Sequence, residues 1–434
     1  MARVLRSGLW RPGRDLPFLV LCAALAASMI RAVDQPAAVV AVAGTDVAVT
    51  PTDAAIAALA VLVLARLLGA GALPRPARAP TLAAAAFSGW LLLSSALNGA
   101  DALSGAAKVL EYGVLALGTV LFVQRRAQLW LLLGALLAVA VVADVWGLVG
   151  LITSGGVRQG AFLGSHDLPA LGTLLLAVAG AILVTRSSRL RWFGVAAALA
   201  GALGVVLGAA LAGLLAVWLV VAAVAALAAA RRSLSLPGLA LMVAVAAAVT
   251  AAAIPIRSGD LGFVEAGPSL QAESAGSWSQ RLIYTYIGWR VFLDNPVLGT
   301  GWHGQLPPSE WAHHLDDARA RFPDQPPHYF PRPNDELIPQ QTYDQVLFEL
   351  GLVGALLFLG LAVVAARAAV RVGRAWPRGG PDEPLAYLPA AWLAAIAAML
   401  AGAALYGGLP LMALFWLTLG VVALAPSLMP PPAR

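Results

Sequence analysis

The sequence is poor in charge and contains only one cysteine and one lysine. Charged residues make up 12% of its 434 residues and hydrophobic residues 60%, which leaves too few polar side chains to cover a water-soluble globule. The single cysteine, Cys22, excludes an intramolecular disulfide framework. The chain is therefore expected to fold in a membrane.

What the sequence has in abundance is apolar runs of roughly 18 to 25 residues, the length at which a helix crosses a hydrocarbon core of about 30 Å. Barrel strands are half as long and alternate in polarity, so an all-α polytopic bundle of about twelve transmembrane helices is predicted. The first run lacks a small-x-small cleavage site before Arg31, which favours a retained span over a signal peptide. The predicted spans are 15–33, 53–72, 80–98, 103–124, 128–152, 166–185, 192–207, 210–230, 236–254, 342–366, 386–406 and 409–426.

Arginines fall in alternate loops, as the positive-inside rule requires of cytoplasmic ones. These arginines are Arg75, Arg78, Arg125, Arg126, Arg186, Arg189, Arg191, Arg231, Arg232, Arg367, Arg371, Arg374 and Arg378. The pattern predicts a multi-pass protein of a bacterial plasma membrane with both termini in the cytoplasm. It also accounts for most of the net charge of +6, so no nucleic-acid partner is indicated. Three parts follow: a bundle over 1–254, an extracytoplasmic loop over 255–341 and a C-terminal bundle over 342–434.

The large outer loop is too rich in Trp, Pro and His to be a disordered linker. Ser277 to Gln280 has the spacing of a capping box, and apolar residues at helical spacing follow it until Asp294-Asn295-Pro296. Arg281 is thus placed in the first turn of an amphipathic helix and Arg290 near its end. Prolines between 323 and 339 predict an extended path, after which a helix starts at Thr342.

No metal-ligand set stands out, because His313 and His314 are adjacent and no His-x-x-x-His or cysteine pair exists. A phosphate loop and a Ser-His-Asp elbow are missing as well. The remaining polar candidates on the outer side are Arg158, Arg281, Arg290, His303, His328, Gln340 and Asp344. Arginine forks suit diphosphate oxygens, so a lipid diphosphate is the natural ligand for this place, although Arg158 alone is equally well explained as an interfacial arginine.

Lys108 and Glu111 lie one turn apart near the outer end of the span over 103–124. Two interpretations stay open. The pair is an internal salt bridge facing the bundle, or Lys108 lies beside the phosphates of a donor.

Several segments resemble the O-antigen ligase and O-antigen polymerase superfamily. Ser279-Gln280-Arg281, Trp289 and Asp294 through Gly301 are similar to its arginine-containing helix and its P-L-L-G-x-G turn. Gln341-Thr342-Tyr343 through Gly354 resembles its H-N-x-Y-L-x-x-L-x-E-L-G-L-x-G segment. Arg158, Gly160 and Phe162 resemble its R-x-x-G-T-F segment.

The resemblance implies a GT-C-like fold and an enzyme, a membrane glycosyltransferase of cell-surface polysaccharide synthesis. Such an enzyme moves an undecaprenyl-diphosphate-linked oligosaccharide to the hydroxyl of a glycan or glycolipid acceptor, without a metal or other cofactor. Arg158 and Arg281 carry over as diphosphate ligands, with Arg290 and Lys108 as further candidates.

Two family features are absent from the sequence. The family histidine is replaced by Gln340, which cannot act as a general base, and a Ser-Arg pair expected near the start of the span over 210–230 is missing from Gly208 to Gly213. Asp344 and His328 are the alternative bases, each also explicable as an ordinary solvated residue. A transporter or flippase, and a non-catalytic relative that binds polyprenyl lipid, are the other functional hypotheses.

Overall fold

The apolar runs fold as helices, which satisfy their backbone hydrogen bonds without help from water. The computed structural model describes residues 12–42, 45–69, 77–154, 158–266, 273–332 and 339–430. In this described part, ten helices are long and apolar enough to cross a membrane, and two shorter apolar helices bring the number to the predicted twelve. They are α2 (Pro12–Ala27), α3 (Pro51–Leu68), α4 (Arg78–Leu97), α5 (Ala100–Phe122), α6 (Arg126–Thr153), α7 (Asp167–Thr185), α8 (Arg191–Gly208), α9 (Leu211–Ala230), α10 (Leu236–Ala266), α13 (Thr342–Ala375), α14 (Leu388–Leu400) and α15 (Pro410–Leu428).

The helical fold class is therefore confirmed, with one small addition. Strands β1 (Ala38–Val42) and β2 (Thr45–Val49) form an antiparallel hairpin between α2 and α3. Short 3-10 turns connect other elements, at η1 (Ala32–Asp34), η2 (Ser188–Leu190), η3 (Pro327–Tyr329) and η4 (Glu383–Ala386).

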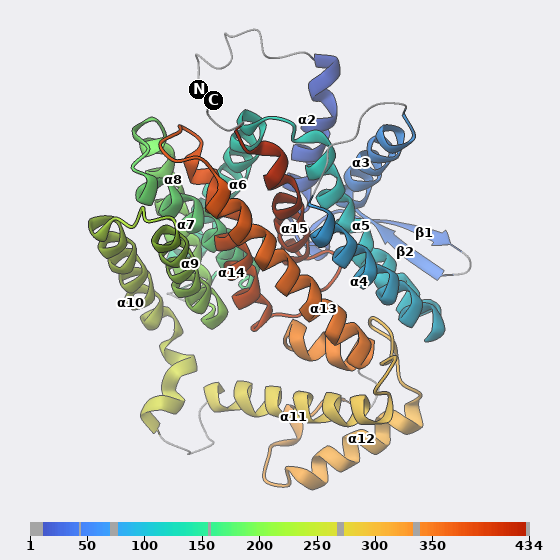
Figure 1. The fold of residues 1–434 in the computed structure, drawn as a ribbon. Helices are drawn as coiled ribbons and strands as arrows, with labels where there is room; N and C mark the ends of the chain where they lie inside the picture. The colour runs from blue at the N-terminus through green and yellow to red at the C-terminus, as the bar shows by residue number, and fades with distance from the viewer. Residues whose placement is uncertain are drawn as a thin grey trace.

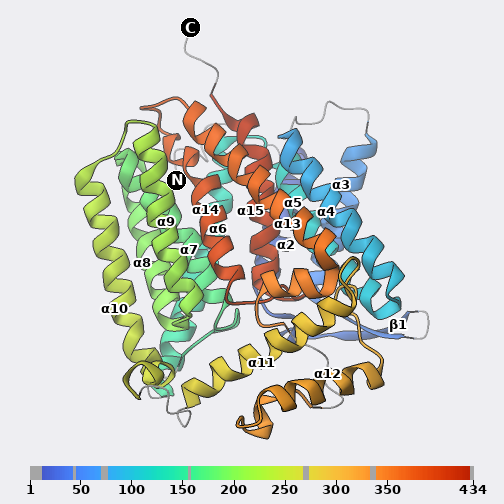
Figure 2. The ribbon, with the colours of Figure 1, turned by 60° about the horizontal axis from the view of Figure 1, so that its bottom comes forward.

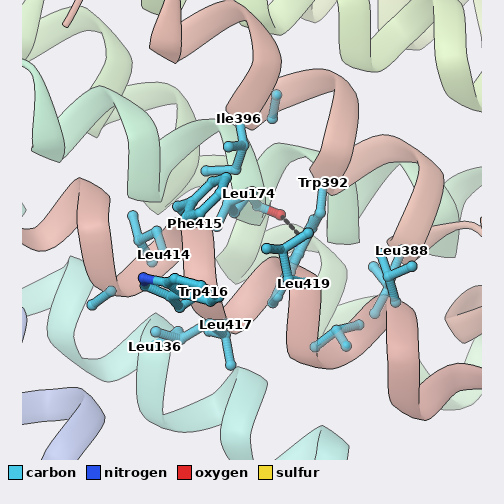
Figure 3. Close-up of a cluster of buried hydrophobic side chains, with 14 of the residues drawn as sticks. Leu136, Leu174, Leu388, Trp392, Ile396, Leu414, Phe415, Trp416, Leu417 and Leu419 are labelled. Carbon is cyan, nitrogen blue, oxygen red and sulfur yellow. Dashed lines mark hydrogen bonds between the residues drawn. The ribbon is translucent and has the colours of Figure 1, made fainter. Parts of the chain in front are cut away.

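Helices α7 and α15 form the centre of the bundle. Of their most apolar windows, 83% and 89% of residues are buried inside the protein, against half or less for the other long helices. Leucine, tryptophan and phenylalanine side chains of α7, α14 and α15 pack there, and the Trp392 indole donates to the carbonyl of Leu174 at 3.0 Å (Figure 3). Many apolar side chains on the outer helices are exposed, among them Val61, Trp146 and Leu359, as expected for surfaces that face lipid.

The segment between α10 and α13 lies across one end of the bundle, which we call the loop face (Figures 1 and 2). It contains α11 (Glu273–Asp294) and α12 (Pro308–Arg321), which share a small core of their own. Helix α11 ends at Asp294 as predicted but begins four residues before the expected start at Ser277, so the capping box is wrong. Helix α12 was not predicted.

Helix α13 is broken at Gly351, whose backbone has φ +66° and ψ −170°. The turn from Pro296 to Gly301 fits into the break: Leu352 N donates to Pro296 O, and Gly301 N to Glu349 O, each at 2.8 Å. A Cβ on Gly351 would lie 2.3 Å from the carbonyl oxygen of Val297. The two segments that resemble the ligase family thus meet backbone to backbone, and the predicted continuous helix from 342 to 366 is wrong at this residue.

The opposite end of the bundle carries the arginine-rich connections and one buried ion pair. Arg231 is 1% exposed and donates to Glu383 at 2.7 Å and to the carbonyl of Trp376 at 2.9 Å. Its guanidinium also lies over the ring of Tyr387. This pair joins the end of α9 to the connection between α13 and α14.

Candidate functional site

A pocket of about 270 Å³ opens at the loop face of the bundle. Its walls come from the turn before α7, from the irregular segment between α14 and α15, and from Arg281 on α11. The lining residues are Arg31, Gly164, Ser165, His166, Asp167, Arg281, Pro339, Gln340, Gly402, Ala403, Ala404, Tyr406, Leu409 and Leu411. Two of the residues expected from the sequence, Arg281 and Gln340, are therefore in one pocket.

Arg158, the third expected residue, borders the same pocket. Its Nε donates to Gly208 O at 2.7 Å and its Nη2 to Ser165 O at 3.2 Å, which fixes the guanidinium beside a lining residue. Arg257 of α10 donates to the next carbonyl, Ala209 O, at 2.7 Å. The family's Ser-Arg pair is missing at the break between α8 and α9. Backbone oxygens at this break instead accept hydrogen bonds from two arginines of other segments.

His166 lies where the fields of these arginines overlap. Burial, and after it the positive charges of Arg158, Arg281 and Arg257 in that order, lower the pKa of its imidazole to about 4. The ring is neutral at pH 7, and its buried Nδ1 has no hydrogen-bond partner among the described residues. Burial also lowers the pKa of Arg281, so its charge is poorly solvated until an anion arrives.

Two helix N-termini point at the pocket, those of α7 and α15. The Asp167 carboxylate accepts a hydrogen bond from Leu411 N at 2.7 Å, which ties the two helix starts together. Gly164 makes the turn before α7 with φ +113°, and a Cβ there would lie 2.9 Å from Asp167 Oδ2. Helix N-termini carry partial positive charge, but the first N–H groups of α7 and α15 already donate to nearby carbonyls and to the Asp167 carboxylate. The anion preference of the pocket therefore rests on its arginines.

The remaining predicted site residues lie outside this pocket. Asp344 accepts hydrogen bonds from Thr285 Oγ1 at 2.9 Å and Gln341 Nε2 at 2.6 Å, which link α13 to α11. His328 is exposed in the turn η3, with its ring edge against Tyr329.

Two cations named as further diphosphate ligands are engaged elsewhere. Arg290 pairs with Asp317 of α12 at 3.0 Å. Lys108 bridges Asp53 of α3 and Glu111, the latter at 2.9 Å, so the predicted salt bridge is present.

A second polar group lies behind the pocket wall. His303 stacks on Tyr406, a lining residue, with ring centroids 4.6 Å apart, and its Nδ1 is 3.3 Å from Glu349 Oε1. Gln345 Nε2 donates to the other oxygen of Glu349 at 3.2 Å. These contacts hold the segment after α14 against the broken start of α13.

Sequence reasoning missed Arg31, His166, Arg257 and Tyr406. Arg31 and Arg257 lie at the span ends that are predicted to face outward, where the positive-inside rule predicts few arginines, and this is a readable signal. For His166 and Tyr406, each in an irregular connection, the sequence offers no comparable signal.

These features define a polytopic helical membrane protein with a cationic pocket at one end of its bundle. The sequence model of the O-antigen ligase family matches residues 172–359, a range that includes Arg257, Arg281 and Gln340. The match supports membership of the O-antigen ligase and polymerase superfamily, as the resemblance of the motifs predicts. Membership indicates a glycosyltransferase-like role in O-antigen synthesis, with lipid-linked glycan donors and glycan acceptors. The comparison with curated proteins gave no match.

Proposed function

We propose that the protein transfers or polymerises an oligosaccharide from an undecaprenyl diphosphate carrier onto an acceptor hydroxyl at the outer face of a bacterial plasma membrane. The loop face is then the outer face, and the end with the Arg231–Glu383 pair faces the cytoplasm. The observation that carries the proposal is the convergence of Arg158, Arg257 and Arg281 around His166, a residue that lines the pocket.

The pocket suits the diphosphate of such a donor. A diphosphate carries several negative charges and accepts many hydrogen bonds, and guanidinium forks offer both complements. When the sugar–phosphate bond breaks, further charge develops on the leaving diphosphate, and arginines fixed in advance stabilise it without rearranging. This route neutralises the leaving group with the chain's own side chains and needs no metal.

An apolar groove of about 570 Å³ supports a polyprenyl carrier. It is lined by α9, α13, α14 and α15, and its residues include Tyr343, Ala397 and Leu400. These lie close in sequence to Gln340 and Gly402, which line the arginine pocket. A chain in the groove would therefore bring its phosphates toward Arg281 without leaving an apolar surface.

His166 is our proposed general base, in place of the family histidine that is Gln340 here. The acceptor oxygen attacks the anomeric carbon, its proton passes to Nδ1 of His166, and the bond to the diphosphate breaks. His166 lines the pocket with a neutral ring, and its buried Nδ1, which has no hydrogen-bond partner among the described residues, is free to take a proton once the acceptor reaches it. Asp344 and His328 lie outside the pocket and would have to move to act as bases, whereas Gln340 lines it and is placed to hydrogen-bond a substrate.

The test is glycan transfer in membranes supplied with the lipid-linked saccharide pool, comparing wild type, Arg281→Ala and Arg319→Ala at matched expression. Arg319 is an exposed residue of α12 and serves as the control for loss of a positive charge. We expect Arg281→Ala to lose at least 100-fold in transfer and Arg319→Ala to keep it, as for removal of one oxyanion-stabilising group. Equal transfer in both variants would refute the arginine pocket as the donor site. No transfer by wild type, with an adequate donor pool, would favour a transporter or a non-catalytic lipid-binding relative.

A further inference from the structure

Three potential metal ligands meet where α11 ends and α12 begins, well away from the arginine pocket. Asp294 is the last residue of α11, and Glu310 and His314 lie one turn apart on α12. His314 Nε2 is 3.5 Å from Asp294 Oδ2 and 3.9 Å from Glu310 Oε1, and all three ligand atoms lie within 4.8 Å of one another. Asp294 follows Arg281 by thirteen residues, which is about 20 Å along a helix.

The imidazole of His314 is the observation that points to a ligand. Its side chain is 1% exposed, and neither ring nitrogen has a hydrogen-bond partner among the described residues. A buried polar group without a partner costs free energy, so such a ring calls for an explanation. Its Nε2 faces the two carboxylates at distances too long for hydrogen bonds but short enough for a shared ion.

The positions of the two carboxylates also call for an explanation, independently of His314. Asp294 places a negative charge at the C-terminus of α11, the end where the helix dipole already disfavours one. Glu310 brings a second carboxylate oxygen within 4.8 Å of the Asp294 carboxylate. Nearby Arg290 is paired with Asp317, so it does not neutralise either of them in this arrangement.

We propose that Asp294, Glu310 and His314 bind a divalent cation of the zinc type, which fastens α11 to α12. One imidazole and two carboxylates are a ligand set that Zn²⁺ accepts, with water in the remaining position, whereas Ca²⁺ and Mg²⁺ prefer oxygen ligands alone. Tetrahedral Zn²⁺ needs ligand atoms roughly 3.3 Å apart, given bonds of about 2.0 to 2.1 Å. The 3.5 and 3.9 Å separations are near this value, and the half-exposed carboxylates have room to close the rest.

The proposed ion stabilises the helix pair and takes no part in transfer. Glu310 and His314 at i and i+4 are a signal present in the sequence, but Asp294 joins them only through the packing of α11 on α12.

The chain supplies a matched control in His313, the exposed neighbour of His314. Full-length protein without a histidine tag, stripped with EDTA in detergent, is titrated with ZnCl₂ by calorimetry and its bound zinc is counted by elemental analysis. We expect one Zn²⁺ per chain for wild type and His313→Ala. For His314→Ala the affinity should fall more than about 100-fold, beyond the loss caused by outer-shell changes.

Asp294→Ala keeps the proposal testable should His314→Ala fail to fold. If the site binds zinc, this variant loses the zinc-dependent rise in melting temperature, while its metal-free melting temperature stays equal or rises because an unfavourable charge has gone. If Asp294 and His314 form only an ion pair, the metal-free melting temperature falls and zinc changes nothing in wild type. Equal zinc binding by His313→Ala and His314→Ala, or no saturable binding by wild type, would overturn the proposal.

Discussion

Replacing Gly351 with alanine tests whether the contact between the turn at 296–301 and the break in α13 holds the loop face together. At φ +66° and ψ −170° an L-residue is strained by about 1–3 kcal/mol. The new Cβ would also lie 2.3 Å from Val297 O and 2.9 Å from Gly299 N, and both are backbone atoms that cannot rotate away. We therefore expect Gly351→Ala to lower the free energy of unfolding by about 3 kcal/mol, which is the upper end of the range for backbone strain without the clash.

The control lies on the same helix. Gly360 has helical geometry and nothing within 4 Å of its Cβ position, so Gly360→Ala should be neutral or stabilising by about 0.5–1 kcal/mol. Thermal unfolding of both variants in detergent measures the difference. For a chain of this length, 3 kcal/mol corresponds to a shift of about 3–6 °C. Melting temperatures that agree within a degree would show that the break is not held by this contact.

Three further predictions concern charged groups. Arg231→Met leaves the Glu383 carboxylate buried without its positive partner and should lower the free energy of unfolding by about 3–5 kcal/mol. The control is Arg232→Met at the exposed neighbouring residue, which should change it by less than about 0.5 kcal/mol in the same unfolding assay. Lys108→Met should lower stability by about 1–3 kcal/mol with the KM for the donor unchanged; a raised KM at unchanged stability would instead place Lys108 at the phosphates. For His166, the base form exists above its pKa of about 4, so kcat/KM should be flat from pH 8 to 5 and fall only near pH 4; a fall centred near 6.5 would contradict our assignment.

The spans were predictable because the helix that each apolar run forms depends on that run alone. A run of about twenty apolar residues forms a helix in lipid whatever surrounds it, so all twelve were found. The break at Gly351 was not predictable, since the residues after it continue the apolar run and only a turn fifty residues earlier in the chain forces the kink. Helix α14 likewise stops at Leu400 rather than 406, because the carbonyls of Ala403 and Leu405 turn away to bind Thr342 and Gln345.

The candidate site was predictable only where a residue ran against a general rule. Arg158 and Arg281 lie in loops that should lack positive charge, and both are at the pocket. Arg290 has the same anomaly, yet an ion pair on a neighbouring helix accounts for it. His166 became visible only in three dimensions, because its role depends on Arg158 nearby in the chain and on two arginines, Arg257 and Arg281, from distant segments.

The short helix α14 has a consequence for where the pocket lies in the bilayer. Thirteen residues span about 20 Å, some 10 Å less than a typical hydrocarbon core. The irregular segment that follows α14 covers the remaining distance, and it lines the pocket together with the first residues of α7 and α15. In our proposal the lipid-anchored carrier then meets the arginines at the level of these helix starts. The carrier would stay in the membrane, and the acceptor would have to reach it there.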